Sequence, residues 1–75
     1  MKERFFEALE HLGVTYNQET GWLSEKINFV VYKNRTNLPV ERVFIIGEQF
    51  LILREDSFRS VKFENIQGFN LIREG

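Results

Sequence analysis

Residues 27–72 decide the fold, and they read INFVVYKNRTNLPVERVFIIGEQFLILREDSFRSVKFENIQGFNLI. Short runs rich in Val, Ile and Phe follow one another here with only turn residues between them, which is typical of consecutive antiparallel strands. Five strands are predicted, over residues 27–33, 40–46, 49–54, 59–64 and 69–72. We therefore expect a mainly β protein whose strands form a small five-stranded antiparallel barrel.

The predicted strands carry apolar side chains on both faces. In the first of them, Ile27, Phe29 and Val31 point to one side while Val30 and Tyr32 point to the other. A sheet with one face in water shows a cleaner alternation of apolar and polar residues. A chain of 75 residues has little left to cover a second apolar face. We therefore expect copies of the chain, or another molecule, to cover it.

Residues 1–13 are predicted to form an amphipathic helix that precedes the strands. Four apolar side chains spaced three and four residues apart share one side of it, namely Phe5, Ala8, Leu9 and Leu12. Gly13 follows at the position where a left-handed residue commonly ends a helix. A helix this short needs tertiary packing, so its apolar stripe is expected to dock on the sheet.

Residues 14–24 have the pattern of a hairpin around a polar turn that contains Gly21. About ten of these residues resemble the hairpin of some phage-type HNH endonuclease and AP2-like modules. An HNH metal site needs several histidines, and His11 is the only histidine here, so the resemblance concerns the turn alone. The expected organisation is one domain over residues 1–75, with the helix, this hairpin and the barrel strands of residues 27–73 in that order.

Composition narrows the class of protein. The chain has no cysteine, ten basic and eleven acidic side chains, and a formal charge of −1, so neither a disulfide framework nor a broad basic surface for duplex DNA is expected. No apolar run approaches the roughly 18–20 residues that cross a bilayer. Charged residues such as Glu3 and Arg4 interrupt any signal peptide. We expect a cytoplasmic protein with no membrane partner.

Catalysis is not expected. It would need a nucleophile beside a base, paired carboxylates in a pocket, or a set of metal ligands. The single histidine lies in the last turn of the predicted helix, where a cation complements the helix dipole. The five glycines are scattered and make no phosphate-binding loop. The sequence therefore predicts a protein without enzymatic activity, cofactor or metal.

A helix followed by five strands with short turns resembles the Sm-like fold, including its Hfq type. Residues 49–53 (QFLIL) look like the third strand of Hfq-type proteins, and residues 66–72 (IQGFNLI) are similar to the Ile-Arg-Gly-Asn-x-Val/Ile pattern of the second Sm motif. The resemblance covers about residues 27–72 and implies an Sm-like or SH3-like barrel that forms rings by strand addition and binds single-stranded RNA. At the family's uridine-contacting positions this chain has Glu64, Asn65 and Gln67.

A second fold stays open. The strand, turn and strand of residues 43–53, followed by residues 63–66, also resemble part of bacterial pleckstrin-homology-like domains. This resemblance implies a half-barrel in place of a closed one.

Two groups of residues are candidates for single-stranded RNA, because cations meet phosphates and aromatic faces stack on bases. The first group is a polar connection that contains Tyr32, Lys33, Asn34 and Arg35. The second group flanks a turn and contains Arg54, Arg59 and Lys62. The alternative is that both groups are ordinary solvated surface, with the cations of the second neutralised by nearby carboxylates.

The function predicted from these features is a non-enzymatic binding module that forms homo-oligomers and binds single-stranded RNA. The alternative is a protein–protein interaction module of phage or mobile-element origin. In that case Trp22, beside a turn glycine, and Phe6, on the flank of the helix, would contact the protein partner, because exposed tryptophans often anchor interfaces.

Overall fold

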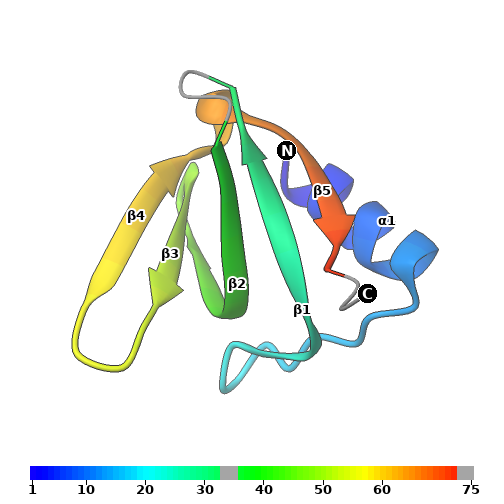
Figure 1. The fold of residues 1–75 in the computed structure, drawn as a ribbon, viewed down its shortest axis with the longest axis horizontal. Helices are drawn as coiled ribbons and strands as arrows, with labels where there is room; N and C mark the ends of the chain where they lie inside the picture. The colour runs from blue at the N-terminus through cyan, green and yellow to red at the C-terminus, as the bar shows by residue number, and fades with distance from the viewer. Residues whose placement is uncertain (33–35, 73–75) are drawn as a thin grey trace.

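The computed structural model of the protein describes residues 1–32 and 36–72 (Figure 1). Along these residues the elements are α1 (Lys2–Leu12), β1 (Trp22–Val31), β2 (Thr36–Ile46), β3 (Gln49–Leu53), β4 (Phe58–Lys62), the 3-10 helix η1 (Phe63–Asn65) and β5 (Ile66–Leu71). The predicted N-terminal helix and five antiparallel strands are thus confirmed.

The strands form one open sheet in the order β4-β3-β2-β1-β5, so the prediction of a closed barrel is wrong. Its two edge strands, β4 and β5, are joined by η1, which bonds to neighbouring turns. Phe63 N donates to Glu48 O at 3.0 Å, and Tyr32 N donates to Asn65 O at 2.7 Å. The connection thus crosses one end of the sheet and does not continue a ladder between the edges (Figure 1).

The second strand begins earlier than predicted. Residues 36–39, expected to be a polar connection, belong to β2, where Leu38 and Val40 are buried and Pro39 between them is exposed. Proline lacks an N–H and is normally barred from central strands. Here β3 pairs only with residues 43–46 of β2, so at Pro39 the strand has β1 as its one neighbour. No strand lies beside Pro39 on the β3 side, so the N–H that proline lacks would have had no ladder partner there.

Other boundaries also differ from the prediction, and β1 begins at Trp22, within residues 14–24 that were expected to form the hairpin. Residues 63 and 64, expected in the fourth strand, lie in η1, and residues 66–68, expected in a turn, belong to β5. The shift has a physical reason, because Ile66 is buried in the core and begins the pairing with β1 opposite Val31.

The helix ends in a Schellman motif. Gly13 adopts φ 73°, its N–H donates to Glu10 O at 3.2 Å, and Val14 N donates to Leu9 O at 2.9 Å. Both Leu9 and Val14 are buried, which supplies the apolar contact that accompanies this motif. The helix lies beside β5 (Figure 1).

Phe5 joins the helix to the sheet. Its fully buried ring lies 5.2 Å from Phe50, 5.3 Å from Phe69 and 5.8 Å from Phe29, all in tilted or edge arrangements that aromatic pairs prefer. Among the residues whose burial the structure describes, the core consists of hydrophobic side chains: Phe5, Leu9, Val14, Leu23, Ile27, Phe29, Val31, Leu38, Val40, Val43, Phe50, Ile52, Val61 and Ile66. One face of the sheet therefore packs against α1 to make the core.

Candidate functional site

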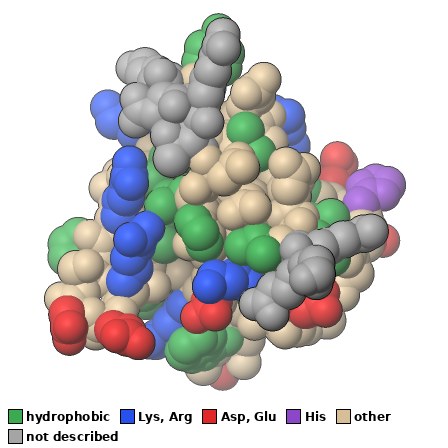
Figure 2. All heavy atoms as spheres, in the orientation of Figure 1, with side chains coloured by type: hydrophobic (Ala, Val, Ile, Leu, Met, Phe, Trp, Pro, Cys, Tyr) green, Lys and Arg blue, Asp and Glu red, His purple; other side chains and the backbone are tan. Residues whose placement is uncertain are grey.

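The other side of the sheet, here called the outer face, is apolar and partly open to solvent. Its apolar residues are Phe44 and Ile46 of β2, Leu51 and Leu53 of β3, and Phe58 of β4, which stands opposite Leu53. Ile46 is 52% exposed and Phe58 68% exposed, while Leu51 and Leu53 are half-buried. Figure 2 shows hydrophobic side chains open to solvent on one side of the molecule, with basic side chains near them. Apolar surface of this kind marks interaction sites.

The turn before β1 covers one corner of the outer face. The Arg42 guanidinium lies 5.4 Å from the Trp22 ring and 5.8 Å from the Phe44 ring, and Arg42 Nε donates to Thr20 O at 2.8 Å. Val43 N donates to Gly21 O at 2.8 Å, which fixes the turn to β2. This turn thus shields Phe44, whereas Ile46 and Phe58 on the same face are exposed.

Trp22 and Phe6, the predicted contacts with a protein partner, lie in different surroundings. The Trp22 side chain is 48% exposed on the outer face, with Arg42 against its ring. Phe6 is half-buried beside the core, with its ring 5.6 Å from Phe5 and 6.1 Å from Tyr16. Packing within the chain accounts for Phe6, whereas Trp22 keeps free surface.

The first predicted RNA-binding group lies mostly outside the described residues. Tyr32 is described and 65% exposed, at the end of β1, but Lys33, Asn34 and Arg35 fall outside those residues. Figure 1 shows the end of β1 and the β3–β4 turn at opposite ends of the sheet. Tyr32 is therefore remote from Arg54, which begins that turn.

The second predicted RNA-binding group is divided between two faces. Arg54, Arg59 and Lys62 are all exposed. Arg59 stands opposite Ile52 and Lys62 opposite Gln49, and the odd spacing between them directs their side chains to opposite sides of β4. Arg54 and Arg59 lie on the same side of the sheet, because Arg59 stands opposite Ile52 and Arg54 follows Ile52 by two residues. Two of the three cations can thus act together.

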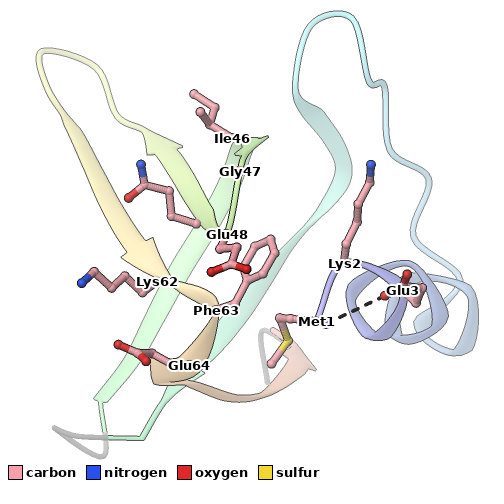
Figure 3. Close-up of a pocket in the computed structure, with 10 residues that line it drawn as sticks. Met1, Lys2, Glu3, Ile46, Gly47, Glu48, Lys62, Phe63 and Glu64 are labelled. Atoms are coloured by element: carbon pink, nitrogen blue, oxygen red, sulfur yellow. Dashed lines mark ion pairs between the residues drawn. The ribbon is translucent and has the colours of Figure 1, made fainter.

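A wide cleft that sequence reasoning missed lies between the start of α1 and the β2–β3 turn (Figure 3). It encloses about 840 Å³, and Ile46, Gly47, Phe63 and Met1 contribute apolar or backbone surface. Its charged groups balance, with Lys2, Lys62 and the terminal amino group against Glu3, Glu48 and Glu64. The amino group itself is 3.9 Å from the Glu3 carboxylate. The cleft joins segments far apart in sequence, so no local pattern signals it.

Acid–base and metal chemistry have little to build on in the described part of the chain. No polar or charged side chain is buried there, and no group of three or more His, Asp or Glu residues could hold a metal ion. His11 is exposed in the last turn of α1. Burial raises the pKa of the Tyr16 hydroxyl, which donates to Val43 O at 2.7 Å. This hydroxyl joins the hairpin to β2 and reaches no cleft described here.

No helix within residues 1–32 and 36–72 has the length and apolar character to cross a membrane. Comparison of the chain with protein-family models, with curated proteins and with solved structures finds no match. The candidate site therefore stands on its own geometry, which is an apolar outer face flanked by an open edge strand.

Proposed function

We propose that the protein is a small non-enzymatic binding module that assembles into homo-oligomers through the edges of its sheet. The observation that carries this proposal is the strand order, which ends in β4 and β5 with no strand beside either of them among the described residues. Unpaired edges are templates for pairing with another chain. The apolar side chains of Ile46 and Phe58 are exposed on the same sheet, and their burial against another copy would also favour association.

The register identifies the backbone groups that β4 offers. Arg54 N donates to Ser57 O at 2.8 Å, so these two residues form a hydrogen-bonded pair of the β3–β4 ladder. Such pairs alternate along an antiparallel ladder. The N–H and C=O groups of Phe58, Ser60 and Lys62 therefore point away from β3 toward the open edge.

Charge favours β5 of another copy as the strand that pairs with β4. Arg59 and Lys62 make β4 basic, so pairing two β4 strands would bring like charges together. Residues 66–71 of β5 carry no charged side chain. The Arg4 guanidinium donates to Gln67 O at one end of β5, which directs pairing to the remainder of that strand. Assembly through unlike edges agrees with the ring formation that the Sm-like resemblance implies.

Proline at position 60 tests the edge directly. Ser60→Pro removes an N–H that faces the open edge and leaves the ladder to β3 intact, whereas Ser60→Ala keeps the N–H. We expect sedimentation velocity to show weaker association for Ser60→Pro than for Ser60→Ala. Equal association of the two variants, with equal folded content by circular dichroism, would contradict the proposal.

Single-stranded RNA is the proposed ligand of this assembly. Support comes from the exposed cations Arg54 and Arg59, which share one side of the sheet, and separately from the exposed Tyr32 ring at the other end of the sheet. A titration with short labelled oligonucleotides at low and moderate salt tests it, because phosphate contacts make affinity fall with salt. Absence of binding at low salt would remove RNA from the proposal and leave the assembly untouched.

A protein partner is the second candidate, favoured by the half-exposed Trp22 ring on the outer face. In that case Trp22→Ala abolishes capture of the partner, and oligonucleotides have no effect. Tyr32→Ala is the control, since it removes an exposed aromatic ring at another place on the surface.

A further inference from the structure

A second, smaller cleft lies where β2 leaves β3, next to Leu53 of the outer face. It encloses about 300 Å³ and is lined by Lys26, Pro39, Glu41, Leu53, Arg54 and Glu55. β2 pairs with β1 at residues 36–40 and again at Arg42, but it pairs with β3 only at residues 43–46, so before Val43 no β3 residue lies beside β2. Pro39 and Leu53 both line this cleft and supply apolar surface to it.

The lining of this small cleft is balanced in charge. Two cations, Lys26 and Arg54, stand with two carboxylates, Glu41 and Glu55, and Lys26 Nζ lies 3.9 Å from Glu41 Oε1. A phosphate or a carboxylate ligand would meet as much repulsion as attraction there. The long stems of lysine and arginine add apolar surface below their charged ends. An uncharged, flat side chain suits this lining best.

Phe58 is such a side chain, and it lies close by. It is 68% exposed, more than Trp22, Ile46 or Tyr32, and it stands opposite Leu53 across the β3–β4 ladder. Neighbouring strands are about 4.8 Å apart, so the small cleft, on the other side of Leu53, is roughly 10 Å from Phe58 along the outer face. A Phe58 ring and the small cleft therefore lie on either side of Leu53.

We propose that two copies of the chain dock by their outer faces about a two-fold axis over Leu53, each inserting Phe58 into the small cleft of the other. A two-fold contact uses the same surface on both copies, so one ring and one cleft on either side of the axis satisfy it. The contact rests on the proposed self-association and adds a face-to-face interface that leaves the β4 and β5 edges available. The balanced charge of the cleft suits a copy of the same surface.

Phe58→Ser tests whether the inserted ring holds the two copies together. Tyr32→Ser is the matched control, because Tyr32 is an aromatic residue of similar exposure that does not line the small cleft. Sedimentation equilibrium should show the dissociation constant between copies rising roughly tenfold or more for Phe58→Ser. The same constant should change by no more than about twofold for Tyr32→Ser. An unchanged constant for Phe58→Ser would overturn the proposal.

Cross-linking tests the geometry at one of the two symmetric contacts, because the second ring and the second cleft of the mixed dimer keep their native residues. The chain contains no cysteine, so a Phe58→Cys copy mixed with a Pro39→Cys copy reports one intermolecular contact. We expect this pair to form a disulfide-linked dimer faster than a Tyr32→Cys copy mixed with the same Pro39→Cys copy. Equal rates would refute the face-to-face contact.

The outcomes separate this contact from edge pairing. Suppose that Ser60→Pro weakens association, while Phe58→Ser has no effect and the cross-linking rates are equal. That result would support pairing through the strand edges and refute the face-to-face dimer. A wild-type chain that is monomeric would refute both.

Discussion

At the scale of single residues, Tyr16 connects the hairpin to the sheet. Its hydroxyl donates to Val43 O at 2.7 Å, and its ring lies 5.5 Å from that of Phe5 in an edge arrangement. Burial raises the pKa of this hydroxyl above the ordinary tyrosine value, because the charged phenolate would lose hydration. The folded protein therefore holds this proton more tightly than the unfolded chain does.

This raised pKa predicts a loss of stability in alkali. The stabilisation is fully present below the unfolded tyrosine pKa of about 10 and is lost as pH rises through the folded value. Tyr32→Phe leaves Tyr16 as the single tyrosine, so ultraviolet absorbance of the phenolate reports it alone. We expect a titration midpoint above the ordinary value. A midpoint at or below that value in the folded protein would contradict the environment described for Tyr16.

Gly21 meets two constraints at once. Its φ of 79° favours glycine, and a Cβ placed there would lie 2.8 Å from Val43 O. Gly47 also has positive φ, 60°, but a Cβ there would meet nothing within 4 Å. Gly47→Ala should thus cost about 1–2 kcal/mol of unfolding free energy. Gly21→Ala should cost about 1–3 kcal/mol more, because β2 must shift.

Urea denaturation of the two glycine variants measures the difference. Equal losses of unfolding free energy would mean that the turn is not packed against β2 as described.

At the scale of elements, α1 depends on one side chain more than on its own helix propensity. Phe5 is fully buried, and the centroids of five other aromatic rings lie 5.2 to 5.8 Å from the centroid of its ring. Phe5→Ala should therefore cost about 3–5 kcal/mol. A chain of this length is stable by roughly 4–11 kcal/mol, so the variant should be largely or marginally unfolded.

Thermal unfolding followed by circular dichroism checks the Phe5 prediction, with the exposed Glu7→Ala on the same helix as control. The control should change the unfolding free energy by less than about 0.5 kcal/mol. A Phe5→Ala protein as stable as the control would show that α1 does not dock through this ring.

Periodicity predicted the elements themselves but not all of their ends. The spacing of Phe5 and Leu9 gave the helix, and Gly13 gave its end, because these signals are local. The start of β2 was missed, since Pro39 is compatible with a strand where β3 is absent from its side. Whether β3 lies beside Pro39 depends on the register between β2 and β3, and no local sequence pattern reveals that register.

Of the described residues predicted to bind RNA or a protein partner, Lys62 lines the wide cleft, Arg54 lines the small cleft, and the others line neither. Trp22 and Tyr32 are exposed, and their roles in binding stay predictions. The small cleft is not signalled by any local pattern, because its lining residues come from β1, β2, the end of β3 and the turn after it. The grouping of Arg59 with Lys62 rested on closeness in sequence. Strand alternation places their side chains on opposite sides of β4.

At the scale of the whole molecule, the sheet is open and its outer face is only partly covered. The hairpin turn shields Phe44, and α1 lies beside β5 on the core side, so neither covers Ile46 or Phe58. The edges at β4 and β5 add unpaired backbone groups to this apolar surface. Burial of both by further copies of the chain is the central claim.

Multi-angle light scattering of the wild-type chain at micromolar concentration tests this claim most directly. The account predicts a mass that is a multiple of 9.0 kDa and that grows with concentration toward a defined assembly. A constant mass of 9.0 kDa over the whole concentration range would contradict it.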